Sequence, residues 1–159
     1  MNAREAYWCA KNIIKGRFLE AEEVIAKDAS YACLYARNVI KGRWPEAEAV
    51  IATYGYCAYA YAENVIRGRW PEGEAVIATN AECACAYAFR VIRGRFHEGE
   101  ATIAKDAKWA YAYAKDVIKG RFPEGERVIL NSEYAEEYQR LFRCKTIEFS
   151  SFLNCKKAK

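Results

Sequence analysis

One glycine recurs at a constant interval through most of this 159-residue chain. The interval is 26 residues without an insertion, and the copies are Gly16, Gly42, Gly68, Gly94 and Gly120. In every copy the glycine is followed by an arginine and an aromatic residue, and then by two glutamates, such as Glu46 and Glu48. Because a fixed period of this length is typical of stacked repeats, we predict that the chain is a repeat array.

Each copy is predicted to form one longer and one shorter helix. In the second copy the longer helix is expected over about residues 29–41, with Asp28 as its N-cap and apolar side chains spaced by four residues. We expect Gly42 to take the left-handed conformation that ends many helices, and Lys41 to lie in the last turn. Pro45 suits the first turn of the shorter helix, where an amide donor is not needed.

Neither helix can bury its apolar face alone, so the copies must pack against one another. The predicted fold is therefore all-α: a right-handed-type α-solenoid of five 26-residue long-helix/short-helix repeats with terminal capping helices. We expect a single solenoid domain over residues 1–159. Residues 1–15 would form an N-terminal capping helix, 16–143 the repeats, and 144–159 a C-terminal cap and basic tail. The expected capping residues are Ile147, Phe149, Phe152 and Leu153.

Two segments carry a resemblance to known repeat proteins. Gly-Arg-Trp-Pro-Glu-Ala-Glu at 42–48, joined to Tyr-Ala-Arg-Asn-Val-Ile-Lys at 35–41, resembles repeats of uncharacterised phage and bacterial proteins. The two-helix unit is also similar to leucine-rich repeat variant and HEAT-like repeats, over about residues 7–143. The resemblance implies a solenoid and, for a phage protein, an inhibitor or decoy of a host protein. It implies no iron–sulfur cluster, because only Cys9 lies near the N-terminus.

The residues needed for catalysis or metal binding are sparse. His97 is the single histidine, and it occupies a position that holds proline in three copies. The seven cysteines mostly replace aromatic residues of other copies, which favours buried free thiols over disulfides or a metal site. We therefore predict no enzymatic activity, no cofactor and no bound metal. The start of the chain lacks the apolar core of a signal peptide, and no stretch reaches the roughly 18 apolar residues of a membrane span, so we expect a cytoplasmic protein with no membrane contact.

A row of cations precedes the glycines and is a candidate binding site. Its members are Lys15, Lys41, Arg67, Arg93 and Lys119. Phosphates could lie along such a row, with Trp44 and Trp70 as stacking faces. Two alternatives remain: cations favour helix C-termini for dipole reasons, and Asn12, Asn38, Asn64 and Asp116 lie one turn back as partners. Residues 1–143 hold 21 basic and 20 acidic side chains, and this near-neutral body weakens a case for nucleic acid.

The arginine after each glycine is instead expected to pair with the glutamate of the Gly-Arg-x-x-Glu turn. Binding specificity should reside where the copies differ, and Phe89 is unusual because its equivalents in the other copies are all charged. We therefore expect a non-enzymatic scaffold that recognises another protein, with Phe89 as a partner anchor. Nucleic-acid binding along the cation row and self-association into a structural assembly are the alternatives.

Overall fold

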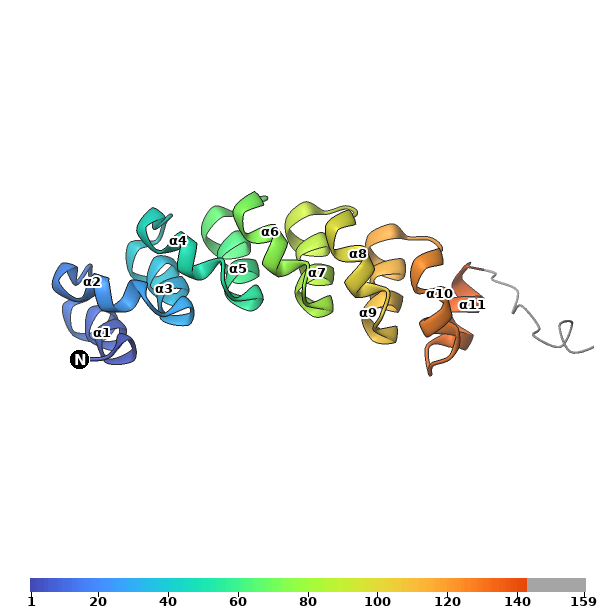
Figure 1. Cartoon of the computed structure of the whole chain (residues 1–159), viewed down its shortest axis with the longest axis horizontal. Coiled ribbons are helices and arrows are strands. Elements are labelled where there is room, and N and C mark those ends of the chain that lie inside the picture. The colour runs from blue at the N-terminus through green and yellow to red at the C-terminus, as the bar shows by residue number, and fades with distance from the viewer. Residues whose placement is uncertain (143–159) are drawn as a thin grey trace, which may run out of the picture.

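The computed structural model describes residues 1–142, and every regular element in that range is a helix (Figure 1). The prediction of an all-α solenoid is confirmed. The expected C-terminal capping residues Ile147, Phe149, Phe152 and Leu153, together with the basic tail, lie outside the described residues. Within residues 1–142, no helix combines the length and the apolar character needed to span a bilayer.

The longer helix of each copy has two halves, an α-helical half followed directly by a π-helical half. These pairs are α1 (Ala3–Cys9) with η1 (Ala10–Ile14), α3 (Ala29–Tyr35) with η2 (Ala36–Ile40), α5 (Gly55–Tyr61) with η3 (Ala62–Ile66), α7 (Ala81–Tyr87) with η4 (Ala88–Ile92), and α9 (Ala107–Ala112) with η5 (Tyr113–Ile118). The shorter helices are α2 (Leu19–Ala26), α4 (Pro45–Ile51), α6 (Pro71–Ile77), α8 (His97–Ile103) and α10 (Pro123–Leu130). A final helix, α11 (Ala135–Phe142), follows α10.

The starts of the long helices follow the predicted capping chemistry. The Asp28 carboxylate accepts hydrogen bonds from the amides of Ser30 and Tyr31, both at 3.0 Å, and Asn80 and Asp106 cap their helices in a similar way. A side-chain oxygen at this position satisfies an amide that has no partner within the helix.

The ends of the long helices differ from the prediction. The left-handed residue is the cation before each glycine, with φ between 54° and 58° in all five copies, and no described glycine has a positive φ. The expectation of a left-handed glycine is therefore wrong. The reason is the π winding: the Ala36 carbonyl accepts the amides of both Lys41 and Gly42, so the second helix ends one residue before its glycine. The same arrangement ends η1, η3, η4 and η5.

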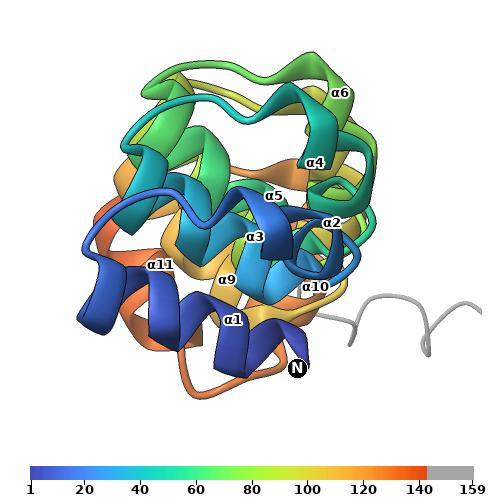
Figure 2. The same ribbon diagram turned by 90° about the vertical axis from the view of Figure 1, so that its left-hand side faces the viewer.

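The copies follow one another in a single row (Figure 1), and each long or short helix contacts its equivalent in the next copy. Seen from the N-terminal end, the short helices α2, α4 and α6 lie to one side of the long helices (Figure 2). Buried tyrosines and isoleucines of successive copies form the core between the two layers. Trp44 and Trp70 belong to this core, with 3% and 1% of their surfaces exposed. They therefore cannot serve as stacking faces, and that part of the binding-site prediction is wrong.

Candidate functional site

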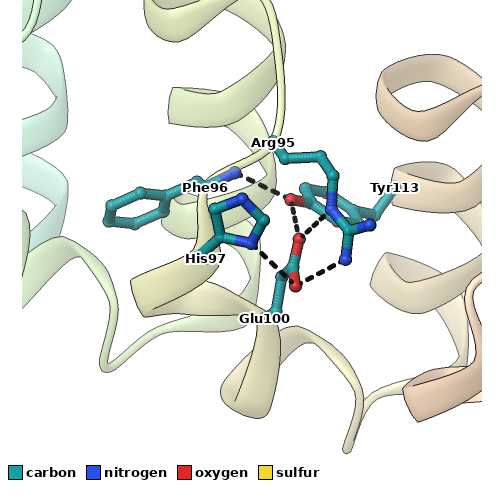
Figure 3. Close-up of polar contacts among 5 residues, drawn as sticks. All are labelled: Arg95, Phe96, His97, Glu100 and Tyr113. Carbon is teal, nitrogen blue, oxygen red and sulfur yellow. Dashed lines mark hydrogen bonds and ion pairs between the residues drawn. The ribbon is translucent and has the colours of Figure 1, made fainter.

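A polar network joins each copy to the next, and Figure 3 shows the one between α8 and η5. The Arg95 guanidinium donates two hydrogen bonds to the two oxygens of Glu100, at 2.7 and 2.8 Å. The Tyr113 hydroxyl donates to Glu100 Oε1 at 2.8 Å and accepts the Phe96 amide at 2.8 Å. Because Tyr113 comes from the following copy, one hydroxyl links the start of a short helix to its neighbour.

The same network occurs five times in the described chain. Its arginine, glutamate and tyrosine are Arg17–Glu22–Tyr35, Arg43–Glu48–Tyr61, Arg69–Glu74–Tyr87, Arg95–Glu100–Tyr113 and Arg121–Glu126–Tyr138. The predicted pairing of these arginines with a glutamate of the same turn is thus confirmed, but the partner is the second glutamate rather than the first. The first, such as Glu46, is exposed.

The network sets the protonation states of its members. The hydrogen bond from Arg69 is the main cause that holds the pKa of the Glu74 carboxyl below its ordinary value, and the bond from Tyr87 adds to it. Burial raises the pKa of Tyr87 to about 12. The carboxylate and the phenol therefore stay ionised and neutral, respectively, at neutral pH, and the network suits a structural role between copies rather than proton transfer.

His97 lies at the edge of one network. Its Nδ1 is 3.4 Å from Glu100 Oε2, and 73% of its side chain is exposed (Figure 3). Among residues 1–142, no three His, Cys, Asp or Glu side chains are grouped so that they could hold a metal ion.

Four cysteines, Cys33, Cys57, Cys83 and Cys85, are buried free thiols, as predicted. Burial raises the pKa of Cys33 and Cys85 to about 12, which disfavours the reactive thiolate. Cys144 and Cys155 lie outside the described residues.

The predicted cation row is exposed along its whole length. Lys15, Lys41, Arg67, Arg93 and Lys119 all lie on the surface, and within residues 1–142 none of them forms an ion pair. The asparagines one turn back are not their partners. Asn38 Nδ2 donates to the Tyr7 hydroxyl, and Asn64 Nδ2 donates to the Ala60 carbonyl, each at 2.8 Å.

Two parts of the row line pockets. A polar pocket of about 490 Å³ lies between the ends of η2 and η3 and is lined by Arg37, Asn38, Lys41, Asn64, Val65 and Arg67. A second pocket, of about 370 Å³, includes Arg93 and Lys119 but also the carboxylate of Asp116. Arg37 was not among the predicted site residues, because its neighbourhood to Arg67 of the next copy depends on how the copies stack.

A third pocket surrounds Phe89, which is 53% exposed. Its volume is about 440 Å³, and its lining comes from three consecutive long helices and includes Tyr56, Tyr59 and Trp109. We call this pocket the Phe89 groove. No residue of a short helix lines it, so it opens on the long-helix face. The sequence identified Phe89 through its departure from the other copies, whereas Trp109 gave no such signal.

Polar residues at the Phe89 groove are only partly paired. Arg90 forms an ion pair with Glu63 at 3.3 Å, and the Tyr56 hydroxyl donates to Glu82 at 2.8 Å. Asp116, which also lines the groove, has no ion-pair partner within residues 1–142. The groove thus combines an exposed aromatic ring with one uncompensated carboxylate.

No protein-family model, curated protein or solved structure matches the chain. The similarity to leucine-rich repeat variant and HEAT-like repeats is therefore one of architecture, a helical repeat arrangement.

Proposed function

We propose that this protein is a non-enzymatic scaffold that binds another protein through the Phe89 groove. The exposure of Phe89, 53% of its surface, is the observation that carries the proposal. Large aromatic side chains in partly enclosed pockets are frequent energetic centres of protein interfaces, because they bury much apolar area at little cost in side-chain entropy.

The charges around the groove define the kind of segment that it would accept. Arg90 and Glu63 compensate each other, whereas Asp116 has no such partner among the described residues. We expect a partner segment with an apolar side chain that packs on Phe89 and a lysine or arginine that pairs with Asp116. A role as an inhibitor or decoy of a host protein is one form of this proposal, and it rests on the sequence resemblance alone.

The test compares three forms of the full chain in affinity capture from cell lysate: wild type, Phe89→Asp and Leu19→Asp. Leu19 is a matched control because it is 67% exposed and lies in α2, outside the groove. We expect a protein that is captured by wild type and by Leu19→Asp and is lost with Phe89→Asp. Equal capture by all three forms, or capture by none, would contradict the proposal.

Self-association is an alternative that light scattering distinguishes directly. A mass near 18.2 kDa, that of one chain, across the micromolar range would contradict it. Nucleic-acid binding is the other alternative. The exposure of all five row cations favours it, but the burial of Trp44 and Trp70 removes the proposed stacking faces.

A further inference from the structure

The polar pocket between η2 and η3 shares no lining residue with the Phe89 groove. We propose that this pocket binds a multiply charged phosphate group of the pyrophosphate type. The groups that would hold it are the side chains of Arg37, Lys41 and Arg67, which line the same pocket. This proposal does not depend on the binding of a protein at Phe89.

The balance of charge in the pocket favours an anion. Three cationic side chains line it, no carboxylate does, and none of the three forms an ion pair with another residue of the described chain. The opposing contribution comes from the two helix C-termini, each equivalent to roughly half a negative charge. Three full positive charges exceed that contribution, so the pocket is positive overall.

The chemistry of the three side chains indicates phosphate rather than a single carboxylate. Arginine presents a planar fork of donors that matches two phosphate oxygens, and lysine adds a point charge. A pocket of about 490 Å³ with three cations from two copies has room for more than one phosphoryl group. A singly charged carboxylate would leave two of the three cations uncompensated.

The backbone supplies an independent argument. Lys41 and Arg67 both have φ of 58°, a left-handed conformation that is strained for residues with a Cβ and that glycine adopts freely. Gly42 and Gly68 stand one residue later, where φ is not positive and an added Cβ would meet nothing within 4 Å. A long cationic side chain therefore occupies the position that favours glycine, and glycine occupies a position that does not require it. Such an arrangement is typical of a residue kept for binding rather than for stability.

The first measurement is a calorimetric titration of the full chain with sodium pyrophosphate at about 0.05 M salt. We expect a Kd below about 1 mM for wild type and at least a tenfold weaker Kd for the double variant Lys41→Ala/Arg67→Ala. The matched control is Arg93→Ala/Lys119→Ala, which removes two cations from the same positions of other copies, beside the carboxylate of Asp116. We expect its Kd to stay within twofold of wild type. No binding by wild type, or equal weakening in both double variants, would overturn the proposal.

A stability readout separates binding from a structural role of the lysine. Lys41→Gly and Lys41→Ala both remove the charge, but only glycine relieves the left-handed strain. We expect both to lose pyrophosphate affinity, and Lys41→Gly to unfold at a higher urea midpoint than Lys41→Ala and no lower than wild type. A midpoint of Lys41→Gly well below wild type, with pyrophosphate affinity unchanged, would show that the lysine is structural and overturn the proposal.

The source of the phosphate is distinguished by competition. Tighter binding of a single-stranded oligonucleotide than of pyrophosphate, with the same loss in Lys41→Ala/Arg67→Ala, would support the pocket and identify a nucleic-acid backbone as its ligand. Displacement by nucleoside di- and triphosphates but not by the oligonucleotide would support it and identify a small ligand.

Discussion

The tyrosine of each inter-repeat network has more polar contacts to lose than any other part of its side chain would suggest. The Tyr87 hydroxyl accepts the Trp70 amide at 2.9 Å and donates to Glu74 at 2.8 Å, and all three residues are buried. At the same time the Tyr87 ring packs against Phe96 of its own copy, with centroids 5.2 Å apart. One residue thus joins two copies through its hydroxyl and the two helices of one copy through its ring.

Replacement of Tyr87 by phenylalanine tests this arrangement. The ring would stay, but a buried amide and a buried carboxylate would each lose a partner, so we expect a loss of about 2–3 kcal/mol in the free energy of unfolding. Urea denaturation followed by circular dichroism measures it. Tyr54→Phe is the control, because Tyr54 is 52% exposed and its hydroxyl makes no hydrogen bond within residues 1–142. Similar losses in both variants would show that the hydroxyl contacts do not matter.

At the scale of the helices, the distance between a long and a short helix depends on a single Cβ. Gly99 in α8 lies so close to α7 that an added Cβ would stand 2.7 Å from the Cβ of Ala84 and 2.7 Å from the Phe96 ring. The equivalent residue in α4 is Ala47, which is fully buried. Equivalent helix pairs therefore need not have the same spacing.

Gly99→Ala is accordingly expected to destabilise the protein by about 1–2 kcal/mol, because the gain in helix propensity is smaller than the cost of separating two packed helices. Thermal unfolding measures the change. In the control variant, Gly94→Ala, the added Cβ would find its nearest atom at 3.9 Å, so the free energy of unfolding should change by less than about 0.5 kcal/mol. An increase in stability for Gly99→Ala would mean that the helices adjust freely.

The same scale shows what the sequence could and could not predict. The stripe of Tyr31, Tyr35 and Val39 predicted the long helix, and Tyr35 is indeed fully buried. The stripe did not predict the π winding of η2, because side chains spaced by four residues suit both windings, and packing against the next copy decides between them. The left-handed residue and the pocket at Lys41 both follow from that winding, so they were beyond reach as well. The buried state of Trp44 was missed for a related reason: its position after the arginine resembles an exposed turn.

Over the whole molecule, five equivalent carboxylates make stability depend on pH. Hydrogen bonds from arginine are the main cause that lowers the pKa of Glu22, Glu48, Glu74 and Glu100 from 4.5. Since the folded state binds protons more weakly than the unfolded state, this contribution is present above about pH 4.5 and is lost as the pH falls through the lowered values. The tyrosines act in the opposite direction: Tyr35 and Tyr87 are raised from a pKa of 10 to about 12, so their contribution is complete below pH 10 and declines towards pH 12.

We therefore expect the urea midpoint to fall steeply between pH 4.5 and pH 3, and again between pH 10 and pH 12. Circular dichroism at a series of pH values measures both limbs. In Glu74→Gln the acid limb should be shallower, because one of the shifted carboxyls is gone. A midpoint that stays constant from pH 7 to pH 3 would contradict this account.

The two ends of the array treat the inter-repeat tyrosine differently. In the first copy its position is occupied by Cys9, so α1 offers no hydroxyl to anything before it. After the fifth copy, α11 provides Tyr138, whose hydroxyl lies 3.0 Å from Glu126. Each intermediate copy supplies one hydroxyl backwards and receives one from the copy that follows. A copy could therefore be duplicated or deleted as a complete 26-residue unit without leaving a donor or an acceptor unmatched, whereas a change of any other length would break the exchange. Arrays of this design can evolve their length in whole units, and a gene that encodes one can grow or shrink by recombination between its own copies while the protein continues to fold.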